Sequence, residues 1–569
     1  MIKKRAHAAV VAGLVALALG AQAASAQPPQ TPAEKADYQQ RGTLYGPMME
    51  YINDLDARSD LMSVQKIART LLGRDLVLVV MSDPPVFQPA DVTKLDKPIV
   101  LIANNVHGGE YAGKDATLAL MRDLVMGELR PLLKQVVVLI VPTLNPDGAE
   151  VYRRTNEQAF DLNRDYVKLE SQEVGGLMSR VMNTWHPDIH VDTHHGGAAP
   201  YTLTMQTCLN PACDQELVAL GNDVIIPRIR QALRQENYEG FWYSGPSRVK
   251  DQDGWAPTSP EPRKHHTYTG LSNSVGFLFE TPNGTHRVTK NGSEVVPVEP
   301  KERYRHQVRG QYIGQREVIR FAAAESARLR GTIRRAIERA IALGSNDADD
   351  DQVVLEYEQV SKGAETFWRT KGWAPGRRPE GPGAPGMPGA PAAAVEYEKV
   401  TLPIFTKFVA TRTTTRPWGY LLPPNLATVV PLLLSHEIAV MTLTGPAEFE
   451  VEVYSAADVR RTTYFQGHYL EAVKAEKRTE TLTLPAGSFF VPSGQPRSNL
   501  ISYLLEPETD DNLVTWNYLD NYLQIRSADL QADPEAMPAA MRAAQAAAQR
   551  IPIYRLMKKA AVKGVLVDR

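Results

Sequence analysis

The feature that most constrains the fold is a series of short, almost wholly apolar runs, separated by stretches long enough to form helices. Runs rich in Val, Ile and Leu predict strands buried on both faces, because only a sheet covered by helices on each side lacks a polar face. Such runs occur at residues 75–81, 98–103, 135–142, 189–193 and 275–279. Residues 45–345 therefore predict an α/β domain, a mixed and mostly parallel sheet flanked by helices.

The character of the chain changes after this domain. Polar and apolar residues alternate, as in residues 448–454, and this pattern predicts strands with one exposed face. We therefore expect a smaller all-β domain over residues 350–525. A tract of Pro, Gly and Ala at residues 374–394 cannot bury a core and predicts a disordered loop within that domain. The Ala-rich residues 534–549 predict that the remaining segment, residues 526–569, is a helical tail.

The N-terminus has the composition of a secretory signal peptide. A short basic segment precedes an apolar run over residues 8–20, and small residues follow it. The run is too short to span a bilayer comfortably, although a membrane anchor is the alternative. We expect residues 1–26 to be removed, residues 27–44 to be flexible, and the mature chain to be periplasmic or secreted, without a membrane span.

The net charge of the chain bears on which partners it could bind. The sequence contains 63 Lys and Arg against 65 Asp and Glu, a formal net charge of −2. Removal of the basic signal peptide would make the mature chain more acidic. The sequence therefore gives no electrostatic reason to expect binding to nucleic acid or to an anionic membrane.

Two cysteines, Cys208 and Cys213, are the only ones in the chain. An exported protein could join them in a disulfide, and they could equally be two buried thiols. Two cysteines without a second pair do not form a structural zinc site. Their state stays open at this point.

The segment NVHGGEYAGKD, at residues 105–115, follows a predicted strand and carries His107 and Glu110. Gly108 and Gly109 would let the backbone turn sharply, so that both side chains face one point. A catalytic zinc ion takes three protein ligands from His and carboxylate and keeps a fourth position open for water. HxxE is a weak motif when it stands alone, and it supplies two of the three ligands.

A third ligand is available in HPDIHVDTHHGG, at residues 186–197. His194 lies where the predicted strand gives way to two glycines, at the kind of sheet edge where open α/β sheets bind ligands. Asp192 lies on the same face of the strand and could orient a ligand through a hydrogen bond. The other histidines of this segment are better explained as structural residues: His186, His190 and His195.

Two further segments could complete an active site. The loop at residues 142–166 carries four polar residues near strand ends: Arg153, Arg154, Asn163 and Arg164. A guanidinium group binds a carboxylate in a bidentate manner and stabilises an oxyanion. Glu280 ends a predicted apolar strand, a position suited to a general base that acts on metal-bound water. A carboxylate that caps a turn is the alternative.

The order of these motifs resembles that of the M14 family of zinc carboxypeptidases. HxxE, NPDG, an arginine, DLNR, a strand that ends in His and a strand that ends in Glu follow one another over residues 45–330. The resemblance implies one zinc ion per chain, bound by His107, Glu110 and His194. It also implies that Glu280 is the general base.

The resemblance further implies how a substrate is bound. Arg154 best matches the family arginine that polarises the scissile carbonyl, with Arg153 as the alternative. Asn163 and Arg164 match the pair that binds the terminal carboxylate of a substrate. The family's substrate therefore carries a free carboxylate, as a peptide or an acylated amino acid does.

The chain departs from the family pattern at two places. Gly109 stands where digestive members have an arginine, so contacts toward the amino side of a substrate should differ. The mobile active-site tyrosine of the family is assigned to Tyr268. Tyr243 is the alternative, because its distance from Glu280 along the chain fits the family better, although no motif surrounds it.

These features predict a zinc-dependent metallocarboxypeptidase. A zinc amidohydrolase or deacylase, or a cell-wall peptide hydrolase, could use the same site. A non-catalytic exported binding protein is the alternative of another class, but it would not need Glu280.

The predicted β domain resembles the region that follows the peptidase domain in an exported bacterial subgroup of the family. Its two histidines, His436 and His468, are better explained as structural histidines.

Overall fold

The computed structural model describes residues 28–39, 42–283, 287–290, 292–348, 350–375, 395–523 and 550–568. The expected signal peptide, most of the Pro, Gly and Ala tract and the predicted helix at residues 534–549 lie outside these residues. Among the described residues, none of the helices combines the length and the apolar character that crossing a bilayer requires.

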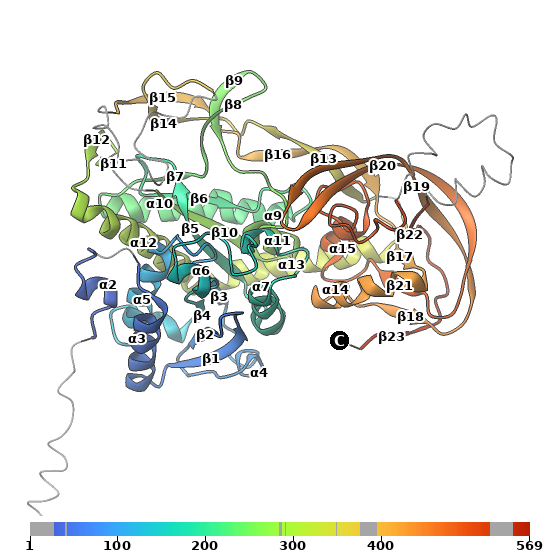
Figure 1. Ribbon diagram of the computed structural model, residues 1–569, viewed down its shortest axis with the longest axis horizontal. Coiled ribbons are helices and arrows are strands. Elements are labelled where there is room, and N and C mark those ends of the chain that lie inside the picture. The colour runs from blue at the N-terminus through green and yellow to red at the C-terminus, as the bar shows by residue number, and fades with distance from the viewer. Residues whose placement is uncertain are drawn as a thin grey trace, which may run out of the picture.

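The first part of the chain is built on an eight-stranded sheet (Figure 1). In sheet order its strands are β1 (Met62–Arg69), β2 (Asp75–Met81), β4 (Val137–Val141), β3 (Ile99–Asn104), β5 (Ile189–Gly197), β10 (Val275–Pro282), β6 (Leu203–Thr207) and β7 (Gly240–Trp242). Strands β4, β3, β5 and β10 are parallel to their neighbours in that run, as are β6 and β7, whereas β1–β2, β2–β4 and β10–β6 are antiparallel. The prediction of a mixed, mostly parallel sheet is confirmed.

Both faces of this sheet are buried, which explains the apolar runs in the sequence. On β2, Val79 and Met81 belong to one hydrophobic cluster and Leu78 and Val80 to the other, because successive side chains of a strand point to opposite faces. Helices α3 (Tyr45–Arg58), α5 (Ala112–Val125), α10 (Ile226–Gln235) and α12 (Arg303–Ala324) cover the first face, and α7 (Gln172–Leu177) and α11 (His265–Leu271) cover the second.

The remaining elements of this part are short or lie at its margins. The helices are α2 (Pro32–Lys35), α4 (Pro89–Val92), α6 (Pro146–Glu150), α8 (Asn183–Trp185), α9 (Gln215–Ala219) and α13 (Ser326–Ser345), and two hairpins pair β8 (Gly245–Val249) with β9 (Gln252–Ala256) and β11 (Arg287–Lys290) with β12 (Glu294–Pro297). Cys208 and Cys213 form a disulfide, which decides the question left open by the sequence.

The segment expected to be flexible, residues 27–44, is held in place where it is described. Helix α2 begins with a capping box at Thr31, and Glu34 accepts a hydrogen bond from Arg122 at 2.6 Å. The expectation of flexibility rested on polar composition alone, and it missed this ion pair with α5.

The later part of the chain is rich in strands. Its seven-stranded sheet has the order β20 (His468–Leu484), β19 (Ala447–Phe465), β22 (Arg550–Leu556), β17 (Gly419–Leu422), β21 (Phe489–Pro492), β18 (Met441–Leu443) and β23 (Gly564–Leu566). Two ribbons pair β13 (Gln352–Val360) with β16 (Lys407–Thr415) and β14 (Ala364–Thr370) with β15 (Tyr397–Pro403). We call the described residues from 350 onward the β module; it also contains helices α14 (Val430–Ser435) and α15 (Ser498–Leu505).

The predicted helical tail is wrong for its described residues, because residues 550–556 are strand β22. This strand pairs with β17 and β19, and Ile551, Ile553 and Leu556 are buried between the sheet and its neighbours. β-Branched and aromatic side chains favour such a position. The Ala-rich composition of the preceding residues gave no indication that the chain returns to the sheet.

The β module packs closely against the first part of the chain (Figure 1). A single hydrophobic cluster runs from Leu139 in β4 through Leu162 to Leu500 and Ile501 in α15. At another place, Phe367 of β14 packs against the indole ring of Trp255 in β9, with the ring centroids 5.2 Å apart. The second face of the eight-stranded sheet is therefore covered in part by the β module.

Candidate metal centre

Three parallel strands bring the predicted metal ligands and base to one edge of the sheet. Strand β3 ends three residues before His107, and His194 and Glu280 lie in the carboxyl-terminal halves of β5 and β10. In the register of these two strands, Glu280 is paired directly with His194. The carboxyl edge of a parallel sheet is where ligands bind in open α/β folds, as expected from the sequence.

The loop after β3 is shaped by an asparagine rather than by its two glycines. Asn105 has a φ of 54°, in the left-handed region, and neither Gly108 nor Gly109 lies there. The Nδ2 atom of Asn105 donates to the carbonyl oxygens of His107 at 2.8 Å and Glu110 at 3.1 Å. The expectation that the glycines make the turn is therefore wrong, since the asparagine makes it and ties the two ligand residues together.

Gly108 is required for close packing instead. A Cβ atom at Gly108 would overlap backbone atoms of Gly148, Ala149 and Arg153, in the loop that begins with the NPDG sequence. The side chain of Asn145, the first residue of NPDG, donates a hydrogen bond to the carbonyl of Arg154 at 3.2 Å. The HxxE and NPDG motifs are therefore two loops that pack directly against each other.

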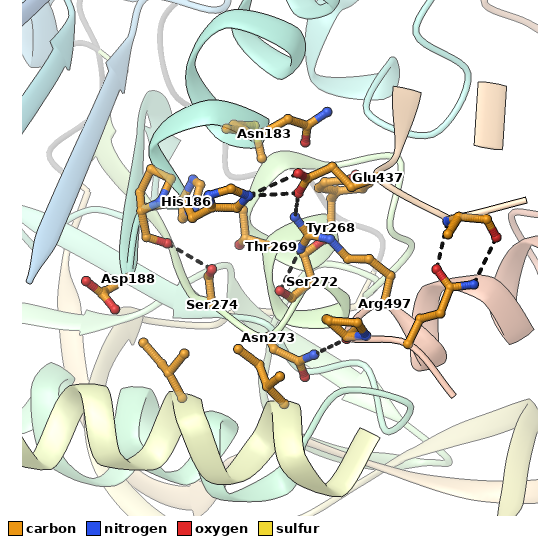
Figure 2. A pocket seen from close by; sticks show the side chains of 18 of the residues that line it. Asn183, His186, Asp188, Tyr268, Thr269, Ser272, Asn273, Ser274, Glu437 and Arg497 are labelled. Atoms are coloured by element: carbon orange, nitrogen blue, oxygen red, sulfur yellow. Dashed lines mark hydrogen bonds and ion pairs between the residues drawn. The ribbon is translucent and has the colours of Figure 1, made fainter. Parts of the chain in front are cut away.

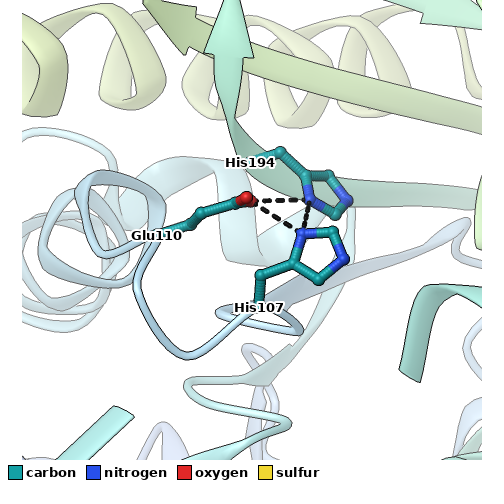
Figure 3. A group of neighbouring side chains, drawn as sticks. All are labelled: His107, Glu110 and His194. Carbon is teal, nitrogen blue, oxygen red and sulfur yellow. Dashed lines mark hydrogen bonds and ion pairs between the residues drawn. The ribbon is translucent and has the colours of Figure 1, made fainter. Parts of the chain in front are cut away.

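The candidate ligand atoms converge on one point (Figure 3). The Oε2 atom of Glu110 lies 3.0 Å from Nδ1 of His107 and 2.9 Å from Nδ1 of His194, and the two Nδ1 atoms are 3.0 Å apart. Ligand atoms at the Zn–N distance of a tetrahedral site lie about 3.3 Å from one another. Both imidazoles are buried, so the spacing and the chemistry of this His–Glu–His group fit a zinc ion.

Each histidine is held from behind by a carboxylate. The Nε2 atom of His107 lies 2.9 Å from Oδ1 of Asp161, and that of His194 lies 2.7 Å from Oδ2 of Asp192. A carboxylate on the far nitrogen fixes the ring and leaves the near nitrogen free to bind a metal. Asp192 makes the contact predicted for it, whereas Asp161, the first residue of DLNR, was not assigned a role from the sequence.

The two neighbouring arginines of the loop point in different directions. Arg154 donates to Oδ2 of Asp161 from Nε at 3.0 Å and from Nη2 at 2.9 Å, and its Nη1 lies 3.3 Å from Oε1 of Glu110. Half of its side chain remains exposed, so its guanidinium group can also reach a substrate. Arg153 instead donates to the exposed Glu157. Only Arg154 lies beside the metal ligands.

Asn163 and Arg164 were expected to bind a substrate carboxylate together, but their side chains lie in different environments. The amide of Asn163 is buried: its Nδ2 lies 2.9 Å from both Oδ2 of Asp192 and Nε2 of His194, and its Oδ1 accepts from the backbone of His265. These contacts use the amide to hold His194. Arg164 is only partly buried, and it donates from Nη1 to the carbonyl of Asn163 at 2.7 Å. It remains the candidate for binding a carboxylate.

Glu280 is buried beside the ligand group. Burial raises the pKa of its carboxyl to about 8 and outweighs the opposite effect of His194 and His107. Its Oε2 atom has no hydrogen-bond partner among the described residues. Burial raises the pKa of the nearby Tyr243, and the negative charge of Glu280 raises it further. A buried carboxylate with an unused oxygen, close to a metal site, is placed to accept a proton from water.

The assignment of Tyr268 as an active-site residue is wrong. Its ring is buried, and its hydroxyl donates to Nδ1 of His436 at 2.8 Å. Tyr268 lines a cavity of about 560 Å³ together with Asp188 (Figure 2). Asp188 directly precedes β5, so this cavity lies at the opposite edge of the sheet from the metal ligands. Helix α11 carries Tyr268 toward the β module, a path that its distance along the chain did not reveal. Tyr243, the alternative, lies close enough to Glu280 and Glu110 for their charges to raise its pKa.

The remaining histidines of the segment are structural, as expected. The Nε2 atom of His186 lies 3.0 Å from a carboxylate oxygen of Glu437, and Nδ1 of His190 lies 3.2 Å from Nε2 of His265. His195 accepts a hydrogen bond from the backbone of α5. None of the three joins the His–Glu–His group.

Known proteins share this sequence pattern. The family model for zinc carboxypeptidases matches residues 48–199, which contain all three candidate ligands. Carboxypeptidase 2 of Trichophyton equinum is 22% identical over 460 residues, which cover 77% of this chain and 78% of the relative. Carboxypeptidase Z of Mus musculus is 29% identical over 177 residues, which cover 28% of this chain and 26% of the relative.

Two solved structures also align with this chain. Carboxypeptidase A from Helicoverpa armigera covers 56% of this chain and 81% of its own, with a TM-score of 0.40 and 16% identity. The metallo-carboxypeptidase from Pseudomonas aeruginosa covers 49% of this chain and 69% of its own, with a TM-score of 0.37 and 17% identity. The family match covers residues 48–199 and this segment carries the metal-binding group, so this part of the chain is similar to the M14 family of zinc carboxypeptidases.

Proposed function

We propose that this protein is a zinc-dependent metallocarboxypeptidase that removes the C-terminal residue of a peptide. One observation carries the proposal: the Nδ1 atoms of His107 and His194 and Oε2 of Glu110 lie within about 3 Å of one another, with the buried Glu280 beside them. A protein that only bound ligands would have no use for a buried carboxylate at this place.

Each residue has a distinct part in the proposed reaction. When bound, zinc supplies Lewis acidity, which polarises the scissile carbonyl and lowers the pKa of water. Glu280 takes a proton from the attacking water and later delivers it to the leaving amine. Arg154 stabilises the negative charge that develops on the carbonyl oxygen. Asp161 and Asp192 hold the two histidine rings in the orientation that zinc binding needs.

The proposal for substrate binding rests on Arg164. Arg164 is partly buried, and its charge lowers the pKa of both Tyr243 and Asp161, which supports a position beside the ligand group. An arginine is suited to binding a carboxylate at two oxygens. Because the amide of Asn163 is used inside the protein, we propose that Arg164 binds the terminal carboxylate without it. The substrate is then a peptide with a free C-terminus.

The test uses the zinc-loaded, full-length protein and three substrates: a peptide with a free C-terminus, the same peptide amidated, and an N-acyl amino acid. Mass spectrometry should show loss of one C-terminal residue from the free peptide. The amidated peptide should react about 10–100-fold more slowly, because a charge-assisted contact is missing. Equal rates for the free and amidated peptides, or cleavage of the N-acyl amino acid alone, would contradict the proposal.

We also propose that the protein is exported and that residues 1–26 are removed. The signal-like composition of those residues supports this, and so does the disulfide between Cys208 and Cys213, since disulfides persist in oxidising compartments. We further propose that the β module marks an exported subgroup of the family. Mass analysis of the protein recovered from outside the cytoplasm should give a chain that starts at Gln27; an intact N-terminus there would contradict the proposal.

A further inference from the structure

A long hairpin of the β module reaches the loop that carries Asp161. Strands β19 and β20 form this hairpin, and its turn consists of Gln466 and Gly467, both with positive φ values of 54° and 85° (Figure 1). The Oε1 atom of Gln466 accepts a hydrogen bond from the backbone nitrogen of Asp161 at 2.8 Å. Residues 305 positions apart in the sequence therefore meet next to the metal centre.

The hairpin tip is fixed on both of its strands. At the start of β20, Nε2 of His468 lies 2.8 Å from Oε1 of Glu170, and its Nδ1 lies 3.1 Å from Oδ1 of Asn517. At the end of β19, the guanidinium carbon of Arg263 lies over the ring of Phe465, 5.6 Å from the ring centroid. These contacts on either side of the turn fix the position of Gln466.

The loop below the tip is held as well. Lys168 is fully buried and donates to the carboxylates of Asp165 at 2.8 Å and Glu170 at 2.7 Å. Its ammonium group also lies over the ring of Phe160, 4.3 Å from the centroid. These contacts hold residues on either side of Asp161, and Gln466 supplies the hydrogen bond to the backbone of Asp161 itself.

Asp161 connects the β module to the metal centre. Its backbone nitrogen is bound by Gln466, while Oδ1 contacts Nε2 of His107 at 2.9 Å and Oδ2 accepts from Nη2 of Arg154 at 2.9 Å. One carboxylate thus orients a metal ligand and the arginine proposed to stabilise the oxyanion. Its position depends on a side chain from a separate part of the chain.

We propose that Gln466 is a positioning residue of the active site, and that the tip of the β19–β20 hairpin is a built part of the metal centre. Through Asp161, Gln466 holds the ring of His107 for zinc and the guanidinium group of Arg154 for the reacting carbonyl. The inference about Arg154 rests on the proposed function, whereas the inference about zinc affinity does not. A hairpin that only joined two parts of the molecule would affect stability and leave both properties unchanged.

The test compares Gln466→Ala with Gln466→Glu in the full-length protein. Gln466→Ala removes the acceptor for the Asp161 nitrogen, and Gln466→Glu keeps an oxygen at the same reach. Lys474→Ala, at an exposed position on the same hairpin, is the matched control. Chelator competition measures the zinc dissociation constant of each variant. Steady-state kinetics with a peptide that has a free C-terminus measure kcat and KM, and thermal unfolding measures stability.

Gln466→Ala should weaken zinc binding by about threefold to tenfold, less than the 10–100-fold expected when a contact to the ligand itself is lost. Its kcat should fall with little change in KM, and Gln466→Glu should restore both properties toward wild type. The inference is overturned if Gln466→Ala matches Lys474→Ala in zinc affinity and kcat, whether or not its melting temperature falls. If the wild type released no residue from any peptide, the proposed function would fail, and the zinc measurement would still decide the role of Gln466.

Discussion

The two candidate histidine ligands use the same ring nitrogen because each is held by an aspartate at the other. Asp161 contacts Nε2 of His107 and Asp192 contacts Nε2 of His194, so both Nδ1 atoms face Glu110. Burial alone would raise the pKa of Asp161, but its hydrogen bond with His107 and the nearby arginines hold that pKa well below its usual range. Asp161 therefore stays ionised whenever it orients the ring.

Replacement of Glu280 tests the proposed general base. Glu280→Gln keeps the shape of the side chain and removes its ability to accept a proton, so kcat should fall by about 10²–10⁴-fold. The zinc content should stay at the wild-type level, because Glu280 is not a member of the His–Glu–His group. Steady-state kinetics and metal analysis check both values. Activity near that of the wild type would rule out Glu280 as the base.

Arg164 and Arg153 form a matched pair for testing carboxylate binding. Arg164→Ala should raise KM for a peptide with a free C-terminus by about tenfold or more, the effect of losing a hydrogen bond to a charged group. Arg153→Ala should leave KM unchanged, since Arg153 points to Glu157. The measurement is steady-state kinetics with free and amidated peptides. An equal effect of Arg164→Ala on both peptides would show that Arg164 does not bind the terminal carboxylate.

At the scale of elements, the metal centre depends on two loops that pack against each other. The HxxE loop follows β3, the NPDG loop follows β4, and Gly108 packs directly against the backbone of the NPDG loop. A side chain at Gly108 would overlap the backbone of Gly148. Backbone atoms cannot move aside as the end of a flexible side chain can, so the two loops must separate to admit even a methyl group.

Gly108→Ala should destabilise the protein by about 2 kcal/mol, in the range found for overpacking, and should weaken zinc binding because His107 and Glu110 are displaced. Gly175→Ala is the control: Gly175 lies in α7, and a Cβ atom there meets nothing within 4 Å. Alanine favours helix, so this variant should be stabilised by up to about 1 kcal/mol. Urea unfolding measures both effects. Equal stability of the two variants would contradict the proposed packing.

The sequence predicted those elements whose formation depends on local pattern. Strands β3, β5 and β10 follow from their apolar runs, and the meeting of His107, His194 and Glu280 follows from the parallel order of these strands. The identity of the metal as zinc was predicted from the resemblance to the zinc carboxypeptidases. The sheet and the His–Glu–His group could both be predicted from local sequence patterns, together with the rule that ligands bind at the carboxyl edge of parallel strands.

What the sequence did not reveal depends on long-range packing. Tyr268 and Tyr243 could not be separated, because the path of the chain between β7 and β10 decides which ring reaches Glu280. The contact of Gln466 with Asp161 joins segments far apart in the chain, and no local pattern marks it. Strand β22 is a single short strand that returns to the sheet after a long separation, so its composition gave little indication of it.

At the scale of the whole molecule, His468 and Glu170 join the β module to the loop of the metal centre. The hydrogen bond with Glu170 raises the pKa of His468 above its ordinary value of 6.5, although Lys168 and burial act against it. Burial alone would raise the pKa of Glu170, but its hydrogen bonds with His468 and Lys168 lower it below its ordinary 4.5.

This pair gives the stability a predicted dependence on pH. The raised pKa of His468 stabilises the fold fully below pH 6.5, and this contribution is lost as pH rises through the folded value. The lowered pKa of Glu170 stabilises the fold above pH 4.5, and this contribution is lost as pH falls through the folded value. The pair should therefore stabilise the protein most between pH 4.5 and 6.5.

His468→Gln removes the charge and keeps a polar side chain. The free energy of unfolding should fall by roughly 0.5 kcal/mol near pH 6 relative to wild type, and by less near pH 9, because the wild-type imidazole is neutral there. Urea unfolding at the two pH values measures the difference. A loss of the same size at both values would show that packing against Trp516, rather than charge, accounts for the effect.

Titration of the metal-free protein with zinc tests the central claim most directly. The His–Glu–His group predicts that hydrolysis of a free peptide is absent without metal and rises in proportion to added zinc, up to one zinc ion per chain. The same titration of His194→Ala should show neither tight zinc binding nor activity. Full activity of the metal-free protein, or wild-type zinc binding by His194→Ala, would contradict the account.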